Sequence, residues 1–179
     1  MVAANATQKH FTLEEFMANP LDQIEWVDGK LVEKDGVTLK HGKIQSRLGC
    51  AWANYRILSK HGGEVYISPP CRTNQNIRRP DVAYLTPELV AQFGNLATLP
   101  QSFPLIAEIV SPTDIAEDVF LKAQEYLASS CQEVWLVFPE SRLIFAVTQD
   151  RILTFRSNDT ATNQQILLGF SIEVDRLLA

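Results

Sequence analysis

Apolar and polar positions change period along the chain, and each period indicates one kind of element. From 41 to 59, apolar residues recur every three or four positions, which predicts a helix with one buried face. Short apolar runs bounded by Gly, Pro or Asp predict strands instead. The predicted strands are 24–27, 30–33, 64–67, 80–85, 105–110, 134–138, 143–147 and 152–155.

Capping signals predict three further helices. Residues 12–15 have the form of a capping box, so a short helix begins there and ends near Pro20. Pro87 stands at the first position of a second helix that runs through Phe93. Asp114 or a neighbour caps a third helix that reaches about residue 129. The tail at 167–178 is predicted to add a short strand or helix.

The order of elements predicts an α/β fold. The run at 105–110 is apolar almost throughout, as in a strand covered on both faces. With the following helix and the strand at 134–138 it forms a strand–helix–strand unit, expected at the centre of a mixed sheet with helices on both faces. Asp28-Gly29 predicts an N-terminal hairpin. The length of 179 residues fits one domain, 1–179.

Composition narrows the class of protein. Hydrophobic residues make up 46% of the chain, which is enough for a full core and excludes a disordered chain. No apolar run approaches the roughly 20 residues that span a bilayer, and residues 1–10 lack a signal-peptide core. We therefore expect no membrane association and a cytoplasmic location. Cys50, Cys71 and Cys131 match neither a zinc nor a disulfide pattern, so reduced and mostly buried thiols are expected.

The charge pattern excludes a protein coated in basic surface, since the formal net charge is −5. A local basic strip remains open, because cations cluster in the half of the chain that carries Asp81. They are Lys40, Lys43, Arg47, Arg72, Arg78 and Arg79. Lys43, Arg78 and Arg79 are candidate contacts to a DNA backbone, and ordinary surface charge is the alternative.

Two acids embedded in apolar runs are the strongest functional signal. Asp81 follows Pro80 at the start of a predicted strand, and Glu108 lies inside another. An acid in a buried strand is unfavourable unless something compensates it. Where carboxylates converge, Mg²⁺ or Mn²⁺ is the usual compensation. The alternatives are a turn-forming role for Asp81 and a buried ion pair for Glu108.

A lysine and a tyrosine follow the second acid on one helix face. Lys122 lies about one and a half turns beyond the cap, and Tyr126 lies one turn later. An ammonium there can stabilise charge on a phosphate or orient the attacking water. Asp, Glu and Lys side chains around Mg²⁺ are typical of sites that cleave phosphodiester bonds. The alternatives are a solvated Lys122 and a core role for Tyr126.

The chain resembles the Uma family of restriction endonuclease-like proteins, a branch of the PD-(D/E)XK superfamily. The resemblance covers most of the chain. The matching segments and residues are 11–16, 24–32, His41, 79–83, 108–114, Lys122, Tyr126 and 133–137. The resemblance implies a restriction-endonuclease-like fold, a mixed central sheet flanked by helices with an N-terminal β-hairpin extension.

The resemblance also implies roles for single residues. Asp81 matches the first acid of the superfamily motif, and Glu108 matches the second. The superfamily usually places a lysine two residues after that acid, where this chain has Val110. The resemblance therefore implies that Lys122 supplies the amine from the following helix. Glu25 matches a further acid that often completes the metal site, and an exposed acid beside the hairpin turn is its alternative.

Two further residues enter through the resemblance alone. The superfamily often uses the backbone carbonyl after the second acid as a metal ligand, which here is the carbonyl of Ile109. His41 matches a recurring family residue, and a capping or packing role at the helix start is its alternative.

The leading interpretation is a Mg²⁺- or Mn²⁺-dependent endodeoxyribonuclease that hydrolyses phosphodiester bonds in DNA. A homodimer is expected, because cutting both strands needs two sites. Val110 and the acidic net charge favour a non-catalytic interaction module with the same fold. A third interpretation is a hydrolase of a small phosphodiester. An open groove lined by Lys43, Arg78 and Arg79 favours a polynucleotide, and a closed pocket favours the small molecule.

Overall fold

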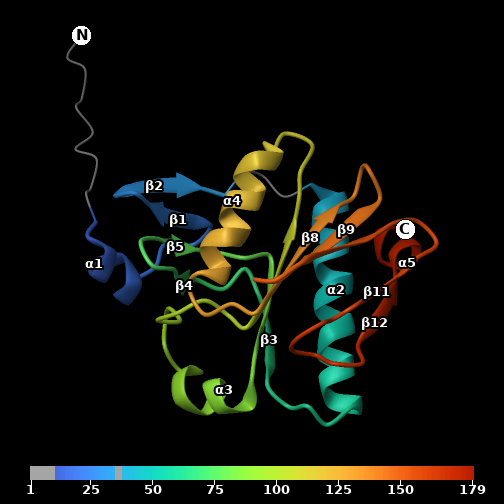
Figure 1. Ribbon diagram of the computed structural model, residues 1–179. Helices are drawn as coiled ribbons and strands as arrows, with labels where there is room; N and C mark the ends of the chain where they lie inside the picture. The colour runs from blue at the N-terminus through green and yellow to red at the C-terminus, as the bar shows by residue number, and fades with distance from the viewer. Residues whose placement is uncertain (1–10, 35–37) are drawn as a thin grey trace.

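The computed structural model describes residues 11–34 and 38–179 (Figure 1). Residues 1–10, where the sequence predicts no signal-peptide core, lie outside the described residues. The helices are α1 Leu13–Ala18, α2 Leu39–Leu58, α3 Pro87–Phe93, α4 Ala116–Leu127 and α5 Val174–Leu178. The strands are β1 Ile24–Val27, β2 Lys30–Glu33, β3 Glu64–Ile67, β4 Cys71–Arg72, β5 Ile77–Arg78, β6 Val82–Leu85, β7 Leu105–Ile109, β8 Glu133–Phe138, β9 Leu143–Val147, β10 Ile152–Phe155, β11 Thr160–Thr162 and β12 Ser171–Glu173.

A six-stranded mixed sheet forms the centre of the fold, with the strand order β10-β9-β8-β7-β6-β3. β7 and β8 pair in parallel, and the other neighbours pair antiparallel. α4 connects β7 to β8, so the predicted strand–helix–strand unit does occupy the middle of the sheet.

Helices cover both faces of this sheet, because its central strands are apolar on both sides. Side chains alternate along a strand, so Ala107 and Ile109 belong to the core on the α2 side and Ile106 to the core on the α4 side. The helices supply Ile44, Leu48 and Trp52 from α2, and Ala123, Tyr126 and Leu127 from α4. Glu108 lies two positions after Ile106 on the strand, so its side chain is on the same face of the sheet and its carboxylate points toward α4.

The N-terminal hairpin belongs to a second sheet, with the order β2-β1-β5-β4. Asp28 and Gly29 join β1 to β2 with φ angles of 50° and 79°, the left-handed conformations that a tight hairpin turn requires. Trp26 pairs with Ile77 of β5, so the hairpin is fixed against the segment that leads to Asp81. β4 and β5 are absent from the sequence prediction, because two residues are too few to show a period.

One helix, α2, begins at a position that differs from the prediction. α2 begins at Leu39 instead of His41, because the Thr38 side chain caps it by accepting a hydrogen bond from the His41 N–H. Ile115 occupies the N-cap position of α4, which agrees with the predicted start at Asp114 or a neighbour, and its side chain makes no capping hydrogen bond. The Asp114 carboxylate instead accepts a backbone N–H within the loop after β7.

The C-terminal tail contains both of the elements that the sequence left open, since β12 is followed directly by α5. β12 pairs with β11, a strand that the sequence prediction lacks. Apolar residues of α5 join the core on the α2 side of the sheet. None of the helices in the described part of the chain combines the length and the hydrophobicity needed to cross a bilayer.

The three cysteines are free thiols, as the sequence predicts. Cys71 and Cys131 are buried. Cys50 is exposed, because its position on α2 lies outside the stripe that faces the sheet.

Candidate active site

The pairing of β6 with β7 brings the two predicted acids together. Val82 pairs with Ala107 in an antiparallel register, so Asp81 stands opposite Glu108 one step further along. The Ile109 N–H donates to Asp81 Oδ2 at 2.7 Å. Both acids line one pocket of about 590 Å³. Other ionisable residues of that pocket are Lys34, His41, Arg78, Asp114, Asp118, Lys122 and Glu125.

Asp81 is held from three sides. Lys34 Nζ lies 2.5 Å from Oδ1, and His41 Nε2 lies 3.2 Å from the same oxygen. Gln45 of α2 donates to the Asp81 backbone carbonyl at 2.8 Å. His41 therefore lies at the acid site, and α2 fixes both the backbone and the carboxylate of Asp81.

The charge state of Asp81 follows from these contacts. Burial alone raises its pKa, but the Lys34 ammonium and the His41 ring outweigh burial and hold the pKa of Asp81 well below its usual range. The carboxylate is therefore ionised at neutral pH.

Glu108 is buried at the α4 side of the sheet, with 8% of its surface exposed. The Tyr126 hydroxyl donates to Oε1 at 2.8 Å, and Lys122 Nζ lies 3.0 Å from the same oxygen. Burial raises the pKa of Glu108, the negative charge of Asp81 adds to that rise, and Lys122 only partly opposes it. Of the two acids, Glu108 is therefore the one whose negative charge is less well balanced by its surroundings.

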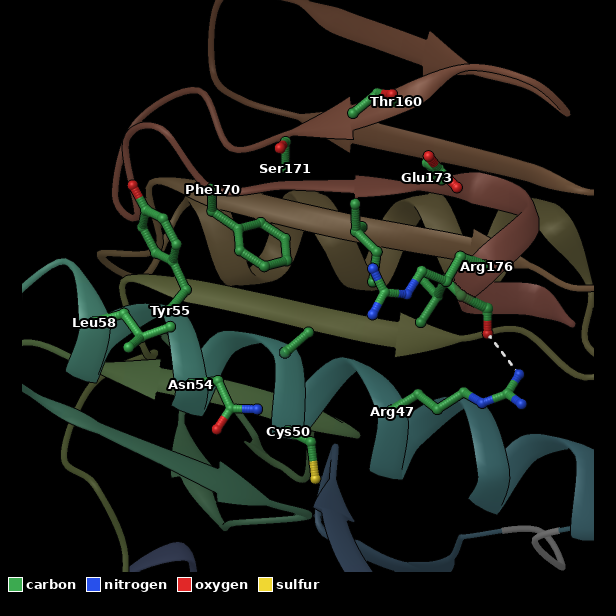
Figure 2. A pocket seen from close by; sticks show the side chains of 13 residues that line it. Arg47, Cys50, Asn54, Tyr55, Leu58, Thr160, Phe170, Ser171, Glu173 and Arg176 are labelled. Atoms are coloured by element: carbon green, nitrogen blue, oxygen red, sulfur yellow. Dashed lines mark hydrogen bonds between the residues drawn. The ribbon is translucent and has the colours of Figure 1, made fainter.

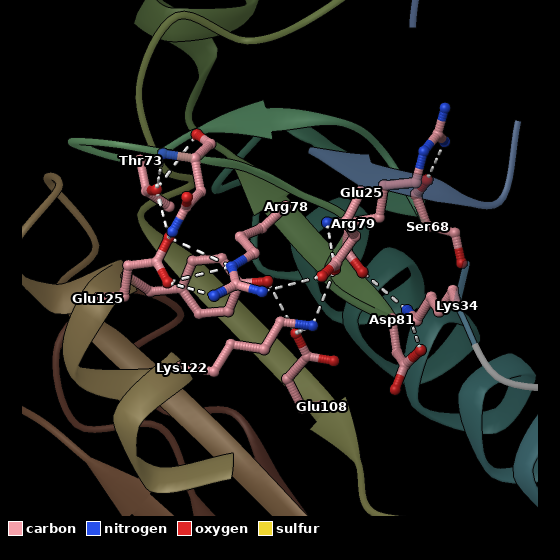
Figure 3. Close-up of polar contacts among 12 residues, drawn as sticks. Glu25, Lys34, Ser68, Thr73, Arg78, Arg79, Asp81, Glu108, Lys122 and Glu125 are labelled. Carbon is pink, nitrogen blue, oxygen red and sulfur yellow. Dashed lines mark hydrogen bonds and ion pairs between the residues drawn. The ribbon is translucent and has the colours of Figure 1, made fainter. Parts of the chain in front are cut away.

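The Lys122 ammonium lies between two carboxylates, as Figure 3 shows. Its Nζ is 2.9 Å from Glu25 Oε1 and 3.0 Å from Glu108 Oε1. The prediction that Lys122 projects from α4 back toward Glu108 is confirmed. Despite burial, the two carboxylates raise the pKa of Lys122, so it remains an ammonium.

Glu25 lies on the other side of Lys122 from Glu108. Its Oε1 also accepts the Arg79 N–H at 2.8 Å, and its Oε2 faces Arg78 Nη1 at 3.2 Å. Burial raises the pKa of Glu25, but the Lys122 ammonium and the Arg79 N–H outweigh burial and lower it to about 2. Both oxygens of Glu25 thus bind protein donors, and its predicted role as a metal-site acid stays a prediction.

A second ion pair ties α4 to β5. Arg78 Nη2 lies 2.6 Å from Glu125 Oε2, and Arg78 Nε lies 3.0 Å from the same oxygen. Glu125 also accepts hydrogen bonds from Thr73 and Asn76 in the turn between β4 and β5. Arg78 is thereby fixed at the wall of the pocket, between Glu125 and Glu25.

The three cations predicted to contact DNA do not come together. Arg78 lines the pocket, whereas neither Lys43 nor Arg79 does. Lys43 is exposed on α2. Arg79 is buried, and its guanidinium donates to backbone carbonyls of three segments, at Leu21, Ile24 and Ser68. Arg79 is therefore a structural clamp in this conformation, and its predicted contact with a phosphate stays a prediction.

Replacing Arg79 with Met is expected to lower the free energy of unfolding by about 2–4 kcal/mol, because three carbonyls lose their donor. Urea unfolding followed by tryptophan fluorescence measures this change. The control is Arg156→Met at an exposed position, where about 0.5 kcal/mol or less is expected. Equal effects of the two substitutions would contradict the structural role of Arg79.

A larger pocket, of about 850 Å³, lies away from these acids, between α2 and the β12–α5 segment (Figure 2). Its polar lining includes Arg47, Asn54, Glu173 and Arg176. Arg47 donates to the carbonyl oxygens of Leu177 and Ala179, which occupies its guanidinium. This pocket contains none of the predicted catalytic residues and a single carboxylate, so the smaller pocket is the candidate active site.

The acid pocket fits a divalent cation of the magnesium type. Within residues 11–34 and 38–179, no group of three His, Cys, Asp or Glu side chains is arranged so that it could hold a metal ion. Mg²⁺ does not require three, since it commonly keeps several waters and binds through one or two carboxylates. Asp81 and Glu108 supply two hard oxygen donors on one pocket, and the raised pKa of Glu108 marks a carboxylate that a further cation would stabilise.

Sequence reasoning missed two residues of this cluster. Lys34 follows a hairpin strand whose four residues are all exposed, so nothing in its neighbourhood distinguishes it from a surface lysine. Glu125 directly precedes Tyr126 and lies three positions after Lys122 on α4. Residues three apart share one face of a helix, and this spacing was the available signal for Glu125.

The fold is that of restriction-endonuclease-like α/β proteins. It resembles the crystal structure titled "a putative nuclease belonging to DUF820" from Anabaena variabilis ATCC 29413, with a TM-score of 0.81 and 18% sequence identity. The match covers 94% of this chain and 97% of the other chain. The predicted fold class is therefore confirmed.

The chain belongs to the Uma2 family, described as "Putative restriction endonuclease", whose model matches residues 8–175. The family resemblance seen in the sequence is thus confirmed. Family and fold together place the chain among restriction-endonuclease-like nucleases. No curated protein matches the chain.

Proposed function

We propose that this protein is a Mg²⁺- or Mn²⁺-dependent endodeoxyribonuclease that hydrolyses phosphodiester bonds in DNA. The observation that carries the proposal is the pocket where Asp81 and Glu108 lie opposite each other, with the Lys122 ammonium 3.0 Å from Glu108. Membership of a nuclease-like family supports the choice of a phosphodiester as substrate.

The side chains of the pocket have separate roles in this proposal. Asp81, Glu108 and the backbone carbonyl of Ile109 would hold the cation. When bound, the cation supplies a nucleophile by lowering the pKa of water, and it offsets charge on the phosphate. Lys122 places a positive charge where negative charge develops on the phosphate. Tyr126 fixes the orientation of Glu108 through its 2.8 Å hydrogen bond.

Cleavage of covalently closed plasmid DNA tests the proposal, because a closed circle has no ends for an exonuclease. The purified protein is expected to nick or linearise the plasmid with Mg²⁺ or Mn²⁺ and to leave it intact with EDTA. Intact plasmid with either metal, from a folded protein that binds the metal, would overturn the proposal.

A non-catalytic interaction module is the second candidate. Two observations favour it. Val110 is apolar and buried at the usual lysine position, and Asp81 and Glu108 each already have a lysine partner. The plasmid assay separates the two candidates, because an interaction module leaves the closed circle intact with either metal.

Of the three cations expected to line a groove for a polynucleotide, Arg78 alone lines the pocket. A small phosphodiester is therefore the alternative substrate, and it is added to the same assay to compete with DNA. For DNA, two nearby sites are needed to cut both strands, so we propose a homodimer. We also propose that residues 1–179 form one domain and that the protein acts in the cytoplasm.

The rate of cleavage is expected to fall as the pH is lowered, with a midpoint above the ordinary Glu pKa of about 4.3. Glu108 must be ionised to hold a cation, and burial raises its pKa. As the pH falls, Glu108 therefore takes up a proton before Asp81 and Glu25, whose pKa values are lowered. The profile of kcat/KM against pH, at subsaturating Mg²⁺, reports this ionisation in the free enzyme. A midpoint at or below the ordinary Glu value would contradict the assignment.

A further inference from the structure

Lys34 occupies the acid pocket although nothing in the sequence gives it a role. Its side chain is only 13% exposed. Nζ lies 2.5 Å from Asp81 Oδ1 and 2.7 Å from the carbonyl oxygen of Arg79, as Figure 3 shows for the contact with Asp81. Lys34 is thus fixed inside the pocket and is not a solvated lysine at its rim.

The bound Lys34 uses the part of Asp81 that a cation needs. Oδ2 of Asp81 already accepts the Ile109 N–H at 2.7 Å, so Oδ1 is the oxygen that faces other partners. Oδ1 is the atom that Lys34 contacts, with His41 Nε2 at 3.2 Å. An ammonium and a divalent cation repel each other strongly at short range in a buried site, so they do not share this oxygen.

The charge of Lys34 also acts on the second acid. Burial raises the pKa of Glu108, and the ammonium groups of Lys122 and Lys34 oppose that rise. Lys34 therefore stabilises both of the carboxylates that a shared divalent cation would join. Its position on the pocket wall, beside Asp81 and Glu108, agrees with this double effect.

We infer that Lys34 is a built-in competitor of the divalent cation, since its ammonium neutralises Asp81 in the metal-free protein and leaves when the cation binds. This inference rests on the proposed metal site at Asp81 and Glu108. The hairpin that precedes Lys34 is anchored to β5, so the displaced ammonium stays at the pocket. There it can contact an anionic phosphate, which couples metal binding to substrate binding through one side chain.

Replacing Lys34 with Met keeps the aliphatic stem and removes the competing charge. Isothermal titration calorimetry is expected to give a Kd for Mg²⁺ about tenfold lower than that of the parent. The metal-free variant is expected to melt at a lower temperature, because Asp81 loses its partner. Mg²⁺ is then expected to raise the Tm of the variant by more than it raises that of the parent.

Two controls separate competition from general damage to the pocket. Lys34→Arg keeps the positive charge and is expected to keep the Kd of the parent. Lys30→Met removes an exposed lysine from the same hairpin and is expected to leave both the Kd and the Tm shift unchanged. If Lys34→Met does not fold, Lys34→Gln serves as the neutral variant in the same titration.

A Kd for Mg²⁺ that is unchanged or higher in the neutral variant would overturn the inference, and so would absence of Mg²⁺ binding in both parent and variant. Tighter Mg²⁺ binding by the neutral variant supports it, whether or not the parent cuts DNA. If that tighter binding appears and plasmid DNA stays intact, the nuclease proposal fails and the competition between Lys34 and the cation stands.

Discussion

Replacement of Glu108 by Gln, or of Asp81 by Asn, is expected to abolish Mg²⁺-dependent cleavage while the protein stays folded. Both changes are nearly isosteric, and each removes one of the two carboxylates proposed to hold the cation. Loss of a catalytic metal site is expected to slow cleavage at least about 10³-fold, or roughly 4 kcal/mol in the activation free energy. Plasmid cleavage under single-turnover conditions measures the rate.

The two substitutions should differ in stability, and the difference checks the electrostatics of the site. The pKa of Glu108 is raised, so ionising Glu108 at neutral pH opposes folding, and Glu108→Gln should hold or raise the Tm. The pKa of Asp81 is lowered, so its charge stabilises the fold above the unfolded-state pKa, and Asp81→Asn should lower the Tm.

The matched control is Glu117→Gln, which removes an exposed acid from the first turn of α4. It is expected to cleave at the rate of the parent. If Glu108→Gln also cleaved at that rate, the catalytic assignment would be wrong.

Replacement of Lys122 by Met is expected to slow cleavage about 10²-fold, because the stem remains and only the charge beside the phosphate is lost. The change also leaves Glu25 and Glu108 without the cation that they share. We therefore expect the free energy of unfolding to fall by roughly 1–3 kcal/mol. Cleavage must be measured at a temperature where chemical denaturation shows both proteins to be folded.

Lys60→Met is the control for Lys122→Met, since Lys60 is exposed after the end of α2. Its rate and stability should match those of the parent. A folded Lys122→Met protein that cleaves at the rate of the parent would contradict the catalytic role of Lys122.

Local signals in the sequence were sufficient for most of the fold. The turn at Asp28-Gly29, the capping box at 12–15 and the apolar run at 105–110 each predict an element that the structure contains. Pairing between short segments left no such signal. β4, β5 and β11 have two or three residues each, and their existence depends on neighbours that are distant in the sequence.

The core of the candidate site was predictable because an acid in an apolar strand is conspicuous. Asp81 and Glu108 were found in this way, and Lys122 through its place on the following helix and the family resemblance. The structure brings all three to one pocket. Lys34 was not found, because only the packing of the hairpin against β5 brings it to Asp81.

The predicted basic strip stays a prediction, but its cations lie in different surroundings. A count of cations shows neither which guanidinium is buried nor what it binds. Arg79 turned out to hold backbone carbonyls, and Arg78 to bridge Glu25 and Glu125. Sequence neighbours with the same charge therefore serve different purposes in this fold.

Anomalous scattering from Mn²⁺ in crystals of the protein tests the central claim most directly. We predict an anomalous peak in the acid pocket, at bonding distance from one oxygen of Asp81 and one oxygen of Glu108, with the Lys122 ammonium nearby. A peak elsewhere, or none at these two carboxylates at a Mn²⁺ concentration that saturates the protein in solution, would contradict the proposed metal site.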